Sequence, residues 1–91
     1  MACQQRKVLF DGDVQGVGFR YTACRMATDY DVTGTVRNLP DGRVECLIEG
    51  EPQEIDRFLA AVTASMGEYI RRTTQQTAPA TGAYRSFTVA F

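Results

Sequence analysis

The spacing of the hydrophobic residues changes twice within the first forty positions, and this constrains the fold more than any other feature. Apolar and polar residues alternate over Lys7–Asp13, which indicates a strand. The spacing then becomes that of an amphipathic helix, at Phe19, Ala23, Met26, Ala27 and Tyr30. Alternation returns over Val32–Leu39, so the chain begins strand, helix, strand.

The middle of the chain repeats this kind of pattern. Pro40-Asp41-Gly42 has the chemistry of a tight turn, and alternation follows over Arg43–Glu49, so the two strands form a β-hairpin. Pro52 suits the first turn of a second helix. The expected buried stripe of that helix is Ile55, Phe58, Leu59, Val62 and Met66.

The C-terminal quarter predicts a last strand that can be divided into two pieces. Tyr69–Thr77 is a weak, polar strand candidate, Pro79–Gly82 is a loop, and Phe87, Val89 and Phe91 alternate. The order β-α-β-β-α-β predicts the α+β class, as a ferredoxin-like α/β sandwich. We expect residues 1–91 to form one domain, an antiparallel sheet with both helices on one face.

Charge and composition exclude several kinds of site. Eleven acidic and ten basic residues give a net charge of −1, which argues against nucleic-acid binding. The chain has no histidine, so histidine metal ligands, histidine general bases and serine-type triads are absent. Nine of the ten basic residues are arginine, so an anion site would use guanidinium groups.

Cysteine usage and hydropathy predict the cellular compartment of the protein. Cys3, Cys24 and Cys46 are far apart and form no CxxC pair, so we expect buried thiols in a reducing compartment. The short apolar run Val8–Phe10 is not a signal peptide, and no stretch approaches the roughly 18 apolar residues of a membrane span. The expectation is a cytoplasmic, soluble protein without membrane contact, and a monomer by default.

The predicted topology places a candidate site at one edge of the sheet. A β-α-β crossover makes the first two strands parallel, and in the usual ferredoxin-like order the third strand lies between them. Their carboxyl ends then share an edge, roughly 10 Å apart at ordinary strand spacing. We therefore expect the loop Asp13–Gly18 to meet Asn38 there.

The loop has the composition of a phosphate cradle. Its candidate contacts are the backbone N–H groups of Gln15, Gly16, Val17, Gly18 and Phe19. These precede or begin a helix, where the dipole also favours an anion, and Arg20 can add a bidentate fork. The alternative is that the glycines only permit a tight turn and that Arg20 is a solvated surface charge.

Asn38 has two interpretations of its own. As a residue beside the hairpin turn, it can serve as a cap for Pro40–Gly42. Near a bound phosphate, its amide can instead orient a water molecule, since it both donates and accepts hydrogen bonds.

Two segments resemble the motifs of the acylphosphatase family. Residues 12–20, GDVQGVGFR, are similar to its first motif, G-x-V-Q-G-V-x-F-R. Residues 34–45, GTVRNLPDGRVE, resemble its second motif, and the spacing agrees from Val8 to Phe91. The resemblance implies an enzyme that hydrolyses the carboxyl-phosphate bond of small-molecule acyl phosphates, with no metal, no cofactor and no phosphoenzyme. By the same resemblance, Arg20 and the amides of residues 15–19 hold the phosphoryl group, and Asn38 positions the attacking water.

Asp13 departs from the family pattern, which more often has a basic or small neutral residue there. A carboxylate beside a bound phosphate costs about 1 kcal/mol at 4 Å in bulk water, and more when partly buried. The cost is small if Asp13 points to solvent or pairs with an arginine such as Arg43 or Arg85. Asp13 is also the one sequence feature that favours a catalytically silent phosphate- or metabolite-binding module.

Two further alternatives are weaker. Asp11 and Asp13 match the D-x-D-x-[TV] opening of magnesium-dependent haloacid-dehalogenase-type phosphatases, but that fold needs a larger parallel domain. RNA-binding modules share the predicted element order, but their central strands carry stacking aromatics, and here those positions are threonine, arginine and glutamate.

Overall fold

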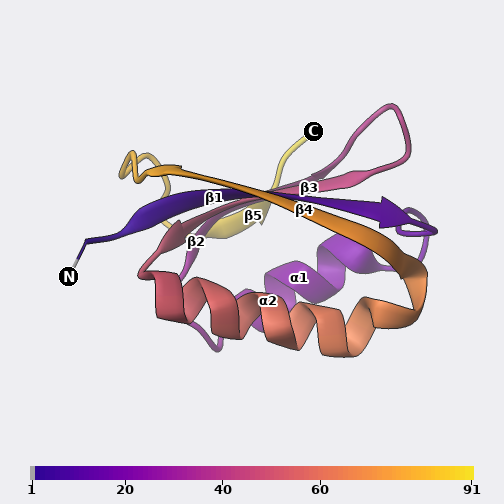
Figure 1. Cartoon of the computed structure of the whole chain (residues 1–91), viewed down its shortest axis with the longest axis horizontal. Helices are drawn as coiled ribbons and strands as arrows, with labels where there is room; N and C mark the ends of the chain where they lie inside the picture. Colours follow the sequence, from indigo (N-terminus) through magenta and orange to yellow (C-terminus); the bar gives the residue numbers. More distant parts are fainter. Residues whose placement is uncertain (1) are drawn as a thin grey trace.

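Both helices lie on one face of a five-stranded sheet in the computed structural model, which describes residues 2–91 (Figure 1). In chain order the elements are β1 (Gln4–Gly12), α1 (Phe19–Ala27), β2 (Thr33–Asn38), β3 (Val44–Gly50), α2 (Pro52–Met66), a 3₁₀ turn η1 (Gly67–Tyr69), β4 (Ile70–Pro79) and β5 (Phe87–Val89). The predicted ferredoxin-like α+β sandwich is confirmed.

The strand order β4-β1-β3-β2-β5 brings the ends of two strands together, as the topology predicted. β1 and β2 both pair antiparallel to β3, so they run parallel to each other on its two sides. Phe10 near the end of β1 and Asn38 at the end of β2 are both register partners of Val44, the first residue of β3. The loop after β1 and the hairpin after β2 therefore leave the sheet at the same edge.

The expectation of an antiparallel sheet holds for every strand pair except the one at the β5 edge. β5 pairs parallel to β2, with Gly34 opposite Phe87, so the sheet is mixed. The last strand does come in two pieces, but they lie on opposite edges, because β4 pairs with β1 and residues 80–86 cross to β2. Phe91, predicted in the final strand, lies beyond its end and is fully exposed.

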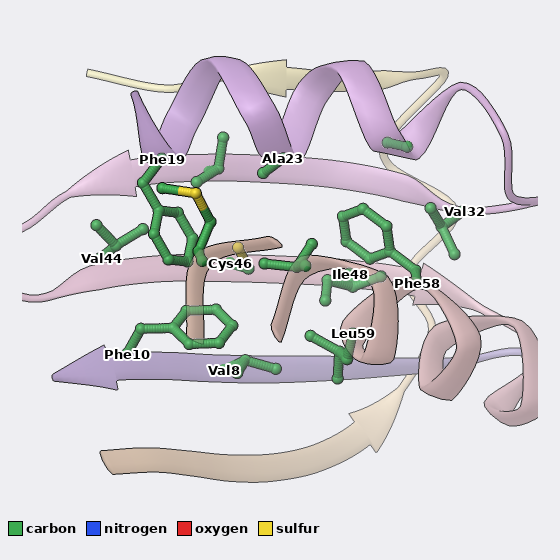
Figure 2. Close-up of a cluster of buried hydrophobic side chains, with 14 of the residues drawn as sticks. Val8, Phe10, Phe19, Ala23, Val32, Val44, Cys46, Ile48, Phe58 and Leu59 are labelled. Atoms are coloured by element: carbon green, nitrogen blue, oxygen red, sulfur yellow. The ribbon is translucent and has the colours of Figure 1, made fainter. Parts of the chain in front are cut away.

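The core fills the space between the sheet and the helices (Figure 2). Every residue of the stripe predicted for α2 is buried. In α1, Phe19, Ala23 and Ala27 are buried, but the helix ends there, so Tyr30 falls in the turn that follows. The Tyr30 ring still reaches the core, with its centroid 6.1 Å from that of Phe58.

The three cysteines do not share one environment. Cys46 is buried and Cys24 is half-buried, but Cys3 is exposed, so the expectation of buried thiols is wrong for Cys3. All three are free thiols. None of the helices within residues 2–91 combines the length and the apolar character needed to cross a membrane.

Candidate active site

A cavity of about 410 Å³ opens at the edge where β1 and β2 end. It is lined by Val14, Gly16, Gly18, Phe19, Arg20, Tyr21, Cys24, Asn38, Val89 and Phe91. The structure thus brings the predicted loop, the predicted arginine and the predicted asparagine to one place. It also adds a group of apolar residues from α1 and from the C-terminal segment.

The loop between β1 and α1 turns through two glycines that adopt left-handed backbone angles. Gly16 has φ 79° and Gly18 has φ 81°, values that other residues rarely adopt. Apart from the two neighbours in the chain, a Cβ placed on either glycine would meet no atom of residues 2–91 within 4 Å. The glycines are therefore needed for the backbone path, and the space beside them is open.

The backbone N–H groups of this loop have no hydrogen-bond acceptor in the part of the chain that the structure describes. Gly18 caps α1 without a side-chain hydrogen bond, and the first helical bond runs from Thr22 N to Gly18 O, at 2.9 Å. None of the N–H groups from Gln15 to Tyr21 donates to another atom of residues 2–91. Unpaired N–H groups at a helix N-terminus favour an anion, because their partial charges add to the dipole of the helix.

Arg20 lies in the first turn of α1 and is half-buried. Its guanidinium carbon is 5.8 Å from the centroid of the Phe91 ring. No ion pair joins Arg20 to an acidic side chain within residues 2–91. The positive charge that lines the cavity is therefore not neutralised by a protein carboxylate.

Asn38 is the last residue of β2, and the turn after it is held by other groups. Leu39 N donates to Arg43 O at 2.8 Å, Gly42 N donates to Leu39 O at 3.1 Å, and Arg43 N donates to Asp41 Oδ1 at 3.1 Å. The Asn38 side chain makes no hydrogen bond to the described residues. The turn is thus capped by Asp41, and the alternative that Asn38 caps it is wrong.

Sequence reasoning missed the role of the Gln15 side chain. Its Nε2 donates to Leu39 O at 2.8 Å and to Arg43 O at 2.9 Å, which fastens the loop to the hairpin. The signal available was an amide side chain in a loop predicted to meet the hairpin, because an amide nitrogen can donate two hydrogen bonds. Gln15 therefore sets the position of the loop relative to the strand end that carries Asn38.

The remaining predicted loop residues differ in what they expose. Gly16, Gly18 and Phe19 line the cavity, whereas Gln15 and Val17 do not. Val17 packs against the core, and the Phe19 ring is buried with its centroid 4.9 Å from that of Phe10.

The side chain of Asp13 is exposed to solvent. Its exposed fraction is 85%, and its Oδ2 lies 3.9 Å from Nη1 of Arg71, which is also exposed. Arg43, one of the partners considered for Asp13, instead pairs with Asp41 at 2.8 Å. The hydrogen bonds from Arg43 hold the pKa of the Asp41 carboxyl below its usual value.

Two other chemistries find little support at this cavity. Burial raises the pKa of the Cys24 thiol, so a thiolate nucleophile is disfavoured at neutral pH. Within residues 2–91, no three side chains of histidine, cysteine, aspartate or glutamate gather closely enough to hold a metal ion.

The ferredoxin-like topology also differs from the parallel domain of haloacid-dehalogenase-type phosphatases, so that alternative is wrong.

Curated proteins similar to this chain include several acylphosphatases. A protein of Methylococcus capsulatus named acylphosphatase is 53% identical over 53 residues, which is 58% of this chain and 58% of that protein. An acylphosphatase of Archaeoglobus fulgidus is 48% identical over 56 residues, 62% of this chain and 63% of the relative. The matched part thus spans less than two thirds of the length of these relatives.

Solved structures extend the similarity to nearly the whole chain. The crystal structure of acylphosphatase from Bacillus subtilis superposes with a TM-score of 0.86 at 29% identity, covering 97% of this chain and 99% of that one. An acylphosphatase from Coxiella burnetii gives 0.75 at 26%, covering 98% and 94%. The acylphosphatase family model matches residues 6–89, which include the loop, Arg20 and Asn38. This chain belongs to the acylphosphatase family.

Proposed function

We propose that this protein hydrolyses acyl phosphates to a carboxylate and inorganic phosphate, without a metal ion. The proposal rests on one observation, which is that amides of the loop, Arg20 and Asn38 line the same cavity. Within residues 2–91, those amides and the Asn38 side chain make no hydrogen bond, and Arg20 has no carboxylate partner. The membership of the chain in the acylphosphatase family supports the same activity.

The loop and Arg20 bind the phosphoryl group. Backbone N–H groups of the loop donate to its oxygens, above all those of Gly16, Gly18 and Phe19, which line the cavity, and the guanidinium of Arg20 adds two parallel donors and a positive charge. In a loose phosphoryl-transfer transition state, charge spreads over the equatorial oxygens. Donors already fixed in position stabilise that charge with little reorganisation, and this stabilisation is the main source of the rate acceleration.

Asn38 orients the water that attacks phosphorus, in line with the bond to the carboxyl oxygen. The new bond joins the water oxygen to phosphorus, and the broken bond leaves its electron pair on the carboxylate. One proton of the water passes to a phosphate oxygen, so the products are a carboxylate and dihydrogen phosphate. No side-chain general base takes part in this step.

A general acid is also unnecessary for this reaction. Carboxylic acids have pKa values near 4, so the carboxylate leaves without being protonated. Phosphate monoesters have a much more basic leaving group, and a site without an acid would hydrolyse them poorly. The residues at the cavity therefore suit acyl phosphates better than monoesters.

We further propose that the protein acts as one domain and as a monomer in the cytoplasm, without nucleic-acid partners. Support comes from the net charge of −1 and from the free thiols, which are typical of a reducing compartment. Light scattering at working concentration gives the molecular mass in solution, and a dimer mass would contradict the monomer.

The decisive experiment follows the loss of benzoyl phosphate by ultraviolet absorbance in the presence of a chelator. We expect turnover by the wild-type protein and a loss of about 10²-fold in kcat for Asn38→Ala, because positioning of a reactant is worth at least that much. Gln53→Ala, an exposed amide on α2, is the control and should retain full activity. If the folded wild-type protein shows no turnover, the protein is the silent binding module instead.

A further inference from the structure

The large exposed hydrophobic side chains of residues 2–91 gather at one place. They are Tyr21, which is 70% exposed, and Phe91, which is fully exposed, and both line the cavity that Arg20 and Asn38 also line. Exposed aromatic groups that cluster at a concave site mark a surface that a ligand can cover.

The apolar side of the cavity comes from two elements that pack against each other. Tyr21 and Cys24 are three residues apart on α1, so they lie on the same face of the helix. Val89 and Phe91 are two residues apart on an extended segment, so they point to the same side. Ala90 N donates to Val36 O at 2.9 Å, which keeps that segment extended beside β2 after β5 has ended.

This apolar side continues directly from the phosphate cradle. Arg20 is the neighbour of Tyr21 in the sequence, and its guanidinium carbon lies 5.8 Å from the centroid of the Phe91 ring. A substrate whose phosphoryl group is held by Arg20 therefore places its acyl group near Tyr21 and Phe91.

The cavity is larger than a phosphoryl group requires. Its volume is about 410 Å³. A phosphorus atom with its oxygens, at roughly 30 Å³ for each water-sized group, fills less than half of that volume. The remaining space has room for an acyl group of several heavy atoms.

Charge decides which acyl group suits this space. Arg20 has the one charged side chain among the described residues that line the cavity. If Arg20 holds the transferred phosphoryl group, a second phosphate or a carboxylate on the acyl group finds no cation there. An anionic acyl group would then lose part of its hydration without gaining a partner, which is unfavourable.

We infer that Tyr21, Val89 and Phe91 form an acyl subsite that selects acyl phosphates with an uncharged, apolar acyl group, such as an aromatic one, over small or anionic acyl groups. The inference rests on the proposed function for the placement of the phosphoryl group. It goes beyond that function because it names the preferred class of substrate and the residues that determine this preference.

The first test compares kcat/KM for benzoyl, acetyl and succinyl phosphates. The wild-type protein should prefer benzoyl phosphate by about tenfold or more, the size typical of filling an apolar pocket. Phe91→Ala and Tyr21→Ala should each lower the value for benzoyl phosphate severalfold while changing that for acetyl phosphate less than twofold. The double variant should lose most of the preference. Tyr84→Ala, an aromatic residue that does not line the cavity, is the matched control and should keep the wild-type ratio.

The second test separates the subsite from catalysis. Benzoylphosphonate and acetylphosphonate cannot be hydrolysed, and calorimetry measures their binding to the wild-type protein and to the Phe91→Ala variant. We expect the wild-type protein to bind benzoylphosphonate about tenfold more tightly, and the variant to bind the two nearly alike. Equal binding of both by the wild-type protein overturns the acyl subsite, whether or not turnover occurs. A clear preference in binding without turnover of any acyl phosphate retains the subsite and overturns the proposed hydrolysis.

Discussion

The two walls of the cavity are held in different ways. The polar wall consists of the loop before α1 and the end of β2, and the Gln15 side chain joins them through two hydrogen bonds of 2.8 and 2.9 Å. The apolar wall includes a strand of only three residues, β5, and the exposed Phe91 beyond it. Side-chain hydrogen bonds join the parts of the polar wall, whereas the apolar wall includes the edge strand of the sheet and is exposed to solvent.

This difference fits a division of tasks. Stabilising a transition state requires donors fixed to within about half an ångström. The hydrogen bonds of Gln15 therefore restrict the wall in which a precise position matters most. Contact with an acyl group requires apolar area more than exact position, and an exposed aromatic ring supplies it. The comparison therefore separates changes that alter rate for every substrate from changes that alter the choice of substrate.

The largest expected effect comes from the polar wall, at Arg20. We expect Arg20→Ala to lower kcat/KM by roughly 10² to 10³, the range found when a donor to developing charge is removed. The loss should be of similar size for benzoyl and acetyl phosphates, because the phosphoryl group is common to both. Arg25→Ala, an exposed arginine later on the same helix, should change little. A loss confined to one acyl group would show that the two walls are not independent.

A substitution at Gln15 tests whether the hydrogen bonds between the loop and the hairpin contribute to activity. Gln15→Ala removes both bonds to the hairpin, and an ordinary hydrogen bond contributes about 1 kcal/mol net. We expect kcat to fall about tenfold and the free energy of unfolding, measured in urea, to fall by about 1–2 kcal/mol. An unchanged kcat would mean that the loop holds its position without the hairpin.

The apolar wall depends on an anchor at the opposite end of β3. Glu49 is buried there, and its carboxylate accepts hydrogen bonds of 2.8 to 2.9 Å from Thr81 N, Thr81 Oγ1, Gly82 N and Gln5 Nε2. Burial alone raises the pKa of Glu49, but these hydrogen bonds outweigh it and hold the pKa below its usual value. The bonds fasten residues 80–86, the segment that leads to β5.

Because the pKa of Glu49 is lower in the folded state than in the unfolded state, folding favours the ionised carboxyl. Its contribution to stability is present above the ordinary glutamate pKa of about 4.3 and is lost as the pH falls through the folded value. We expect Glu49→Gln to lower the free energy of unfolding by about 1–3 kcal/mol at pH 7. Urea denaturation from pH 7 to pH 3 should show this difference shrinking below about pH 4. A difference that stays constant over this range would contradict the anchor.

The smallest effect is expected at Asp13. Its carboxylate is exposed and lies beside Arg71, so its repulsion of a bound phosphate is weak and screened by salt. Asp13→Asn should change KM less than twofold, measured at low and at moderate ionic strength. A larger decrease in KM would place the carboxylate closer to the bound phosphate than the structure has it.

The helices and inner strands were predictable because their patterns are strong. The stripe of α2 follows the helical period without a break, and Val44, Cys46 and Ile48 in β3 alternate and are all buried. The edge strands were harder to predict. Every residue of β4 after Ile70 is exposed, so it has no apolar alternation to read, and β5 has only three residues.

The candidate site divides in the same manner. Its polar residues come from two contiguous segments whose meeting follows from the topology, so Arg20, Asn38 and the loop glycines could be predicted. Tyr21, Val89 and Phe91 come from different parts of the chain and bear no local signal of a shared purpose. The hydrogen bonds of Gln15 could not be predicted either, because their acceptors are backbone carbonyls far along the chain.

The ferredoxin-like order of elements, the tight turn of the glycine-containing loop and the polar half of the site follow from the sequence alone. These depend on hydrophobic periodicity and on backbone angles, which are properties of neighbouring residues. Three features emerge only from the folded chain: β5 runs parallel to β2, Glu49 anchors the segment before β5, and Phe91 lies beside Arg20. Each of these depends on the path of residues 80–86, which cross from the β4 edge of the sheet to the β2 edge, and contacts between residues so far apart in the sequence leave no local pattern.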